Sequence, residues 1–198
     1  MRKDGNIIWD YRNEINKPIV AGTLLLSEPF MQDPSFIRST CLVVSHIPED
    51  GTFGFVLDKV SPHKLSELID IKIDKEVKVY FGGPVDLQSL FYLHNNNFNL
   101  TGAKKITENL YWGGDFDELL MKLESNIAQL DDIKFILGYS GWDGGQLRKE
   151  IIENSWIINS DYPLQISEAN SKLWHNVLNK MGGVYKTFVT LPIDPNLN

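Results

Sequence analysis

Short apolar runs separated by glycine, proline and polar residues occupy much of the chain, and most have the length of single strands. The segment Pro48-Glu-Asp-Gly51 has turn composition, so the runs on its two sides predict an antiparallel hairpin. The predicted strands are residues 22–27, 40–46, 54–58, 77–81, 90–94, 135–139, 156–159 and 186–191.

Apolar residues three and four positions apart predict helices between these strands. Ser61-Pro62 is a typical helix start, and Asp115 is a predicted N-cap ahead of a stripe that extends to Ile127. Further helices are predicted at 143–154 and 167–181, the second ended by Gly182-Gly183. Strands come first and helices follow without regular βαβ alternation, which predicts an α+β fold rather than a doubly wound sheet.

Residues 1–18 have the composition of a polar extension ending at Lys17-Pro18, and residues 19–198 are predicted to form one domain. The apolar trio Ile7-Ile8-Trp9 is expected to pack on that domain or on a second subunit. A chain of 198 residues buries enough surface to fold without disulfides or metals.

The charge balance bears on the classes of partner. The formal net charge is -7, and the densest basic cluster is Lys104-Lys105, which disfavours direct nucleic-acid binding. The single cysteine, Cys41, excludes an intrachain disulfide and is predicted to be buried and inert. No run approaches the roughly 18 apolar residues of a membrane helix. These features predict a cytoplasmic protein that does not bind membranes.

The segment Gly138-Tyr-Ser-Gly-Trp-Asp-Gly-Gly-Gln-Leu147 is the most distinctive in the sequence. Asp143 and Gln146 have the spacing of a capping box at the start of a helix. Three interpretations are open. A rigid turn pinned by a buried Trp142 is favoured. The second is a phosphate or carboxylate pocket at the helix start, although the lysine of a P-loop is missing. The third is a nucleophilic Ser140, although the glycine spacing differs from that of a hydrolase elbow.

Other residues are weaker candidates. Gly82-Gly83-Pro84 is predicted to be a tight turn and His94 a hydrogen-bonded structural residue. Two roles are open for Arg38, anion binding or an ion pair with Asp58 or Glu28, and the ion pair is favoured. The histidine spacing does not predict a metal site, and no cofactor or catalytic residue is predicted. A pocket is expected where the turn at 82–84, His94 and the turn at 141–146 meet. The candidate ligand-binding residues are Gly82, Gly83, Pro84, His94, Gly141, Trp142, Gly145, Gln146 and Arg38.

Several pieces, in order and with their spacing, resemble the AlgH/YqgE family of bacterial proteins. The family usually has Asn followed by a basic residue where this chain has Asp58-Lys59, and often Ala at Ser140. The matching pieces, which span roughly residues 20–185, are Gly22-Thr-Leu-Leu-Leu-Ser-Glu-Pro29, Phe36-Ile-Arg-Ser39, Gly54-Phe-Val-Leu57, Gly82-Gly-Pro-Val85, Leu93-His94, Gly113-Gly-Asp115, Gly138-Tyr-Ser-Gly-Trp142, Gly145-Gln-Leu147, Glu150, Trp156 and Trp174.

This resemblance implies an α+β fold with a bifurcated, mostly antiparallel sheet, part of which closes as a small barrel, surrounded by helices. The family is often labelled as transcriptional regulators, and no established catalytic or DNA-contact residue can be carried onto this chain. We therefore expect a noncatalytic regulatory or binding protein that acts through a protein partner or a small anionic ligand. The alternative is a hydrolase that uses Ser140 or His94, or a small-anion-binding enzyme that uses the Gly138–Gln146 turn.

Overall fold

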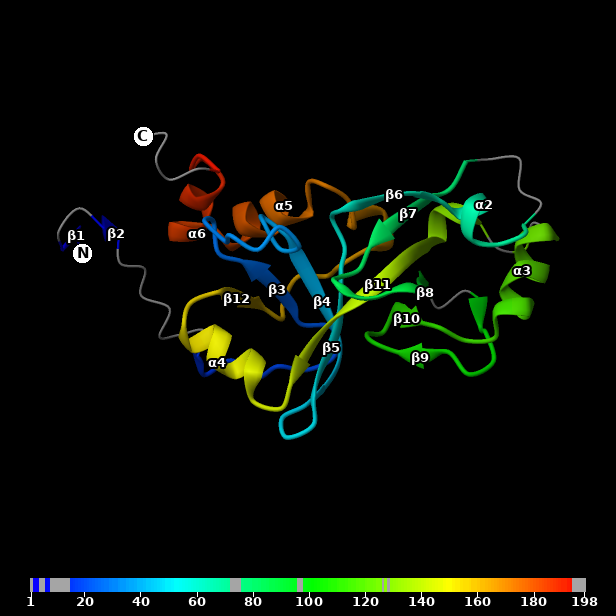
Figure 1. Cartoon of the computed structure of the whole chain (residues 1–198), viewed down its shortest axis with the longest axis horizontal. Coiled ribbons are helices and arrows are strands. Elements are labelled where there is room, and N and C mark those ends of the chain that lie inside the picture. The colour runs from blue at the N-terminus through cyan, green and yellow to red at the C-terminus, as the bar shows by residue number, and fades with distance from the viewer. Residues whose placement is uncertain are drawn as a thin grey trace.

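The computed structural model describes residues 2–3, 6–7, 15–71, 76–95, 98–125, 127 and 129–193. Figure 1 shows two lobes along the long axis, with strand β11 (Ile133–Asp143) running diagonally from one into the other. The side chain of Ile7 and residues 8–9 lie outside the described part, so the predicted packing of this apolar trio stays a prediction.

Most of the predicted strands are present in the structure. Besides β11, the strands are β1 (Arg2–Lys3), β2 (Asn6–Ile7), β3 (Leu24–Ser27), β4 (Thr40–Ile47), β5 (Gly51–Val56), β6 (Val60–Lys64), β7 (Lys78–Phe81), β8 (Val85–Asn95), β9 (Lys104–Lys105), β10 (Leu110–Trp112) and β12 (Trp156–Asn159). The helices are α2 (Leu65–Leu68), α3 (Phe116–Glu124), α4 (Gln146–Ile152), α5 (Leu173–Met181) and α6 (Gly183–Phe188), with 3₁₀ turns η2 (Leu130–Asp132) and η3 (Ile166–Glu168).

The main sheet is large and almost wholly antiparallel. Its strand order is β12-β3-β4-β5-β11-β8-β10-β9, and β7 branches from β11 as the one parallel neighbour among the described strands, with β6 paired to β7. The α+β class and the β4–β5 hairpin are confirmed. The small closed barrel implied by the family resemblance is not formed, because among the described strands β12 and β9 end the order without pairing to each other.

The first lobe has three layers, because both faces of its strands are buried. Leu24 and Leu26 point towards α5 and α6, whereas Leu25 points towards α4. We call the first group, which includes Trp174 and Phe188, the α5 cluster. The second, which includes Trp142 and Trp156, is the α4 cluster. Burial on both faces explains why the sequences of these strands are continuous apolar runs.

The second lobe holds the α3 cluster, in which Leu119 and Leu123 pack against Phe135 of β11. The cap of α3 is as predicted, since the Asp115 carboxylate accepts the Glu118 N–H at 2.9 Å. Ile127 was predicted to extend the buried stripe, and this was wrong. The helix ends at Glu124, and the Ile127 side chain is 75% exposed.

Two predicted elements have the wrong type. The helix predicted to start at Ser61 begins only at Leu65, as α2. Residues 61–64 belong instead to the edge strand β6, and Pro62 is tolerated there because an edge strand can lack a donor. Residues 186–191 were predicted to be a strand, but residues 183–188 form α6. Its Tyr185 and Phe188 lie three positions apart and pack on the α5 cluster. No helix in the described part of the chain is long and apolar enough to cross a membrane.

Candidate functional site

The turn after β7 packs directly on the middle of β11. The Gly82 N–H donates to the Leu137 carbonyl at 2.9 Å, and the Gly82 carbonyl accepts the Ser140 hydroxyl at 3.0 Å. Gly82 and Gly83 are buried, and a Cβ on either would overlap backbone atoms of residues 138–140, whereas Pro84 is exposed. The two glycine-rich segments therefore lie in direct contact, and at Gly82 and Gly83 the space is filled by the backbone of residues 138–140.

Ser140 and Cys41 lie in the interior beside this turn, both with no exposed surface. Burial raises the pKa of the Cys41 thiol far above its ordinary value, in agreement with the predicted inert role. A serine nucleophile needs a base within hydrogen-bond reach, but the Ser140 hydroxyl donates to a backbone carbonyl. This geometry gives the hydrolase alternative no support.

The distinctive segment at 138–147 builds a tryptophan clamp, which we define as Trp142, Glu150 and Trp156. One carboxylate oxygen of Glu150 accepts both indole N–H groups, from Trp142 at 2.9 Å and from Trp156 at 2.8 Å. Phe36 packs edge-on against Trp156, with ring centroids 5.2 Å apart. Trp142 is buried, as predicted for a rigid turn. The segment thus joins β11, α4 and β12 into one unit.

The predicted capping box is half present. The Gln146 side chain accepts the Asp143 N–H at 2.9 Å and donates to Glu150 at 2.9 Å. The helix itself begins at Gln146 instead of Asp143, with Gly145 as the N-cap in the left-handed region at φ 76. Gly141 is exposed and has an ordinary φ. Gln146 therefore supports the tryptophan clamp through its second bond.

Replacing Glu150 by alanine is expected to destabilise the protein by about 1–3 kcal/mol, because it leaves two buried indole N–H donors without an acceptor. Glu150→Gln should cost less, since its amide oxygen can still accept. Urea unfolding measured by tryptophan fluorescence tests this order. Lys149→Ala, on the exposed side of the same helix, is the control and should change stability by less than about 0.5 kcal/mol. Equal stability of Glu150→Ala and the wild type would contradict the clamp.

His94 lies at the far end of β8 from the glycine turns. It pairs with Ile133, whereas Val85 at the other end pairs with Tyr139, so roughly 30 Å of strand separates the two positions. The His94 ring lies 2.9 Å from the Asn95 carbonyl and 3.0 Å from the Gly113 carbonyl. The prediction of a pocket shared by His94 and the glycine turns is therefore wrong. No group of three or more His, Cys, Asp or Glu in the described residues is placed to hold a metal.

Arg38 fixes the chain to the C-terminal helices. Its guanidinium donates to the Leu191 carbonyl and lies 5.4 Å from the centre of the Trp174 ring. Burial lowers the pKa of Arg38. The predicted pairing with Asp58 or Glu28 is replaced by this carbonyl and this ring. Arg38 holds a structural position, with φ 46 at the end of the turn before β4.

Of the predicted binding residues, Gly145 lines a hollow of about 500 Å³ at the start of α4. We call it the Gly145 hollow. Arg148 and His46 also line it, together with Asp143, whose carboxylate opposes a negative ligand. The His46 ring forms a hydrogen bond through Nδ1 with the Thr52 hydroxyl, at 2.7 Å.

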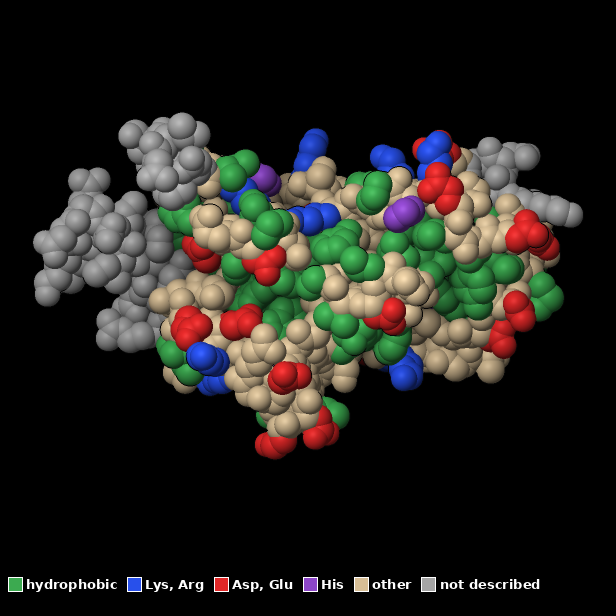
Figure 2. All heavy atoms as spheres, viewed as in Figure 1, with side chains coloured by type: hydrophobic (Ala, Val, Ile, Leu, Met, Phe, Trp, Pro, Cys, Tyr) green, Lys and Arg blue, Asp and Glu red, His purple; other side chains and the backbone are tan. Residues whose placement is uncertain are grey.

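A group of half-buried rings forms an aromatic face across β5, β8, β10 and β11. Phe53 lies at its centre, 4.9 Å from Tyr139, 5.4 Å from Trp112 and 5.9 Å from Phe91 between ring centroids. Figure 2 shows hydrophobic side chains gathered over the middle of the face in view. These rings cover the edge of the α5 cluster.

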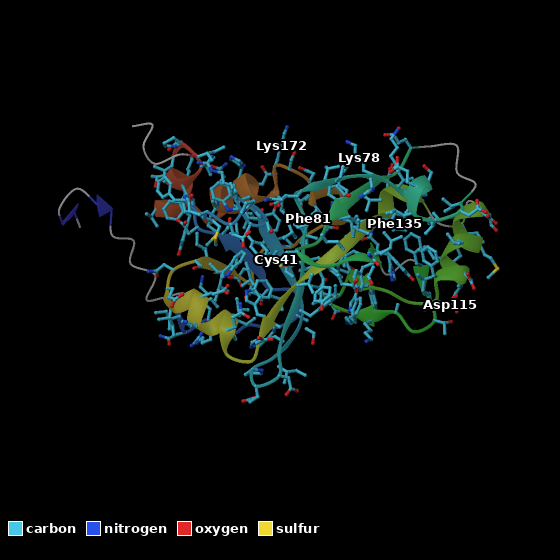
Figure 3. The ribbon with its side chains drawn as sticks, in the orientation of Figure 1. Cys41, Lys78, Phe81, Asp115, Phe135 and Lys172 are labelled. Atoms are coloured by element: carbon cyan, nitrogen blue, oxygen red, sulfur yellow. The ribbon has the colours of Figure 1, made fainter. Side chains whose placement is uncertain are left out.

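A second hollow, of about 450 Å³, contains a buried lysine. We call it the Lys134 hollow. It lies between the start of β11, β7 and the turns η2 and η3, and Lys78, labelled in Figure 3 at the upper edge of the sheet, lines its mouth. Its walls are mostly apolar and include Val77, Tyr80, Leu130, Ile133, Ile166 and Ala169.

Lys134 is only 4% exposed, which is rare for a lysine. Its Nζ donates to the Ala169 carbonyl and lies 2.8 Å from the centre of the Tyr80 ring. Burial lowers the pKa of Lys134 to about 6, although the nearby Asp58 acts in the opposite direction. At neutral pH the amine is mostly uncharged. A strongly perturbed group inside a hollow marks a candidate functional site.

The sequence interpretation missed Lys134 because it began this strand at Phe135. The structural strand begins at Ile133, and alternation places Lys134 on the same face as Ile136, in the interior. The available signal was a single lysine inside the run Ile133-Lys-Phe-Ile-Leu137. The hollow itself also needs η3, which lies more than 30 residues further along the chain and cannot be placed by local pattern.

Comparisons with known proteins fit the sequence resemblance. A UPF0301 protein of Cytophaga hutchinsonii is 37% identical over 182 residues, covering 91% of this chain and 100% of that protein. One from Bacteroides fragilis is 36% identical over 179 residues, covering 89% of this chain and 90% of that protein.

Two solved structures share the fold. A crystal structure of a Corynebacterium diphtheriae protein has a TM-score of 0.71 at 21% identity, covering 89% of this chain and 94% of that one. The solution structure of AlgH from Pseudomonas aeruginosa has a TM-score of 0.67 at 23% identity, covering 87% and 94%. The model of the family described as AlgH-like matches residues 24–186. The chain therefore belongs to the AlgH-like family.

Proposed function

We propose that this chain is a noncatalytic binding protein whose ligand is a small, neutral and largely apolar molecule held in the Lys134 hollow. The observation that carries this proposal is a buried lysine on the wall of an apolar hollow of about 450 Å³. That volume is within the range of small-molecule sites, and apolar walls with a few polar groups are typical of them.

The charge of the hollow favours a neutral ligand. The Lys134 amine is mostly uncharged at neutral pH, so it offers no fixed positive charge to an anion. The other charged residues that line the hollow are two acidic ones, Glu76 and Asp131, and one basic one, Lys78. An amine donor on apolar walls suits a ligand with one hydrogen-bonding group on a hydrocarbon body.

Thermal denaturation in the presence of benzyl alcohol, cyclohexanol and hexanol tests this function. A ligand at about 100 times its Kd stabilises by about 2.7 kcal/mol, which corresponds to roughly 5–10 °C in Tm for a chain of this size. We expect at least one of these alcohols to raise Tm. Ser167 is exposed at the rim, so Ser167→Trp should block the hollow and abolish the shift.

Ser167→Ala is the matched control and should keep the full shift. Absence of stabilisation by all three alcohols, or an equal shift in Ser167→Trp, would overturn the proposal. The anionic ligand expected from the glycine-rich turns stays a prediction. The regulatory role, the protein partner and the cytoplasmic location stay predictions as well.

A further inference from the structure

We propose that Lys134 binds its ligand covalently and reversibly, through addition of its amine to a neutral aldehyde or ketone to give an imine. This inference rests on the proposed function, because the carbonyl compound must first enter the Lys134 hollow. It adds the chemical class of the ligand and the atom that holds it.

The position of Nζ suits a nucleophile. Lys134 lines the hollow, so the amine borders the space in which a ligand would sit, while 96% of the residue's surface is shielded from water. Its hydrogen-bond acceptor is the neutral carbonyl of Ala169, and the carboxylate that acts on it electrostatically is Asp58. A neutral amine needs no charged partner in this buried position, whereas an ammonium would rely on the Ala169 carbonyl and the Tyr80 ring.

The charged and titratable groups around the amine leave it largely unprotonated. Burial is the main effect and lowers the pKa of Lys134 to about 6, while the charge of Asp58 acts to raise it. The Tyr80 ring packs against the Lys134 amine, and Glu76, Lys78 and Asp131 line the hollow. Exposed lysines have pKa values near 10.4, so at pH 7.5 only about one in 1,000 of them is a free amine.

The proposed step is balanced without an oxidant or a metal. The Nζ lone pair attacks the carbonyl carbon, a C–N bond forms, and the carbonyl oxygen takes up a proton. The first proton on oxygen comes from the amine. The carbinolamine then loses its hydroxyl group together with the remaining N–H proton as water, which leaves a neutral C=N bond that can take up a proton from solvent. A protonated imine at this position would face the Tyr80 ring, 2.8 Å from Nζ in the free protein, and the ring would stabilise its charge. Hydrolysis reverses the sequence.

Reductive trapping tests the proposal on the full chain. The protein is incubated with benzaldehyde and sodium cyanoborohydride at pH 7.5, and benzylated lysines are quantified by peptide mass spectrometry over time. We expect Lys134 to be labelled at least ten times faster than Lys78, which lies at the mouth of the same hollow and is exposed. Labelling spread over exposed lysines, with Lys134 unmodified, would overturn the inference.

Two variants test whether the fast labelling requires the Lys134 amine itself. Lys134→Met keeps the length and burial of the side chain and should abolish the fast labelling, whereas Lys78→Met should leave it unchanged. The comparison between Lys134 and Lys78 within the wild-type protein requires no variant to fold. Fast labelling that persists in Lys134→Met would contradict the assignment.

Benzyl alcohol distinguishes the two proposals, because it has the shape of benzaldehyde without the carbonyl group. Stabilisation by benzyl alcohol without an adduct on Lys134 would refute imine formation and leave the binding function intact. Failure of both compounds to stabilise or label the protein would refute both. Competition of benzyl alcohol against labelling of Lys134 would support both.

Discussion

Gly83→Ala is expected to destabilise the protein by about 3–5 kcal/mol. An added Cβ would overlap the Tyr139 carbonyl and the Ser140 amide, which are backbone atoms of the central strand β11 and cannot move aside cheaply. The φ of Gly83 is 149, in a region that residues with side chains rarely adopt, and this adds strain. Urea unfolding followed by circular dichroism measures the loss.

Gly141→Ala is the matched control, from the other glycine-rich segment. Its φ is ordinary, and an added Cβ would meet the Tyr139 ring at 3.2 Å, a side chain that is half-buried and can shift. We expect a change below about 1 kcal/mol. If both variants were equally stable, close approach of the two backbones would not explain why glycine occupies position 83.

Asp58→Asn is expected to stabilise the protein by about 2–4 kcal/mol at pH 8. Asp58 is 7% exposed, its Oδ2 accepts the Thr40 N–H at 2.7 Å, and its buried Oδ1 has no partner among the described residues. Burial raises the pKa of Asp58 to about 7. Between about pH 4 and pH 7 the folded state binds more protons than the unfolded state, so wild-type stability falls as pH rises through this window.

The stabilisation should therefore be small at pH 4, grow up to about pH 7 and then level off. The difference between variant and wild type is the quantity to measure by urea unfolding, because Lys134 acts in the opposite direction. Its lowered pKa makes stability rise with pH from about pH 6. Asp50→Asn in the exposed β4–β5 turn is the control and should show no such profile. A stability difference that does not change with pH would contradict the buried carboxylate.

The sequence was informative where burial repeats along the chain. Apolar runs located β3, β4, β7 and β12, and the spacing within residues 138–147 correctly indicated a turn pinned by Trp142. It failed where distant pairing overrides local preference. Ser61-Pro62 has the residue types of a helix start, but pairing of Val60 with Tyr80 and of Lys64 with Lys78 holds the segment as a strand.

The candidate site could be predicted far less well, for a physical reason. Glycine marks close backbone approach as readily as it marks a ligand, and at Gly82 and Gly83 the neighbour is the protein itself. The Lys134 hollow is formed by segments from three parts of the chain, and the lowered pKa of its lysine arises mainly from burial by all of them. Neither property has a local sequence pattern.

Strand β11 supplies side chains to every core of the molecule. Ile136 belongs to the α5 cluster, Phe135 and Leu137 to the α3 cluster, and Trp142 to the α4 cluster. Each cluster would lose packed side chains without this strand, so we expect the two lobes to unfold as a single cooperative unit. An occupant at Lys134, near the start of β11, should therefore slow amide hydrogen exchange in both lobes.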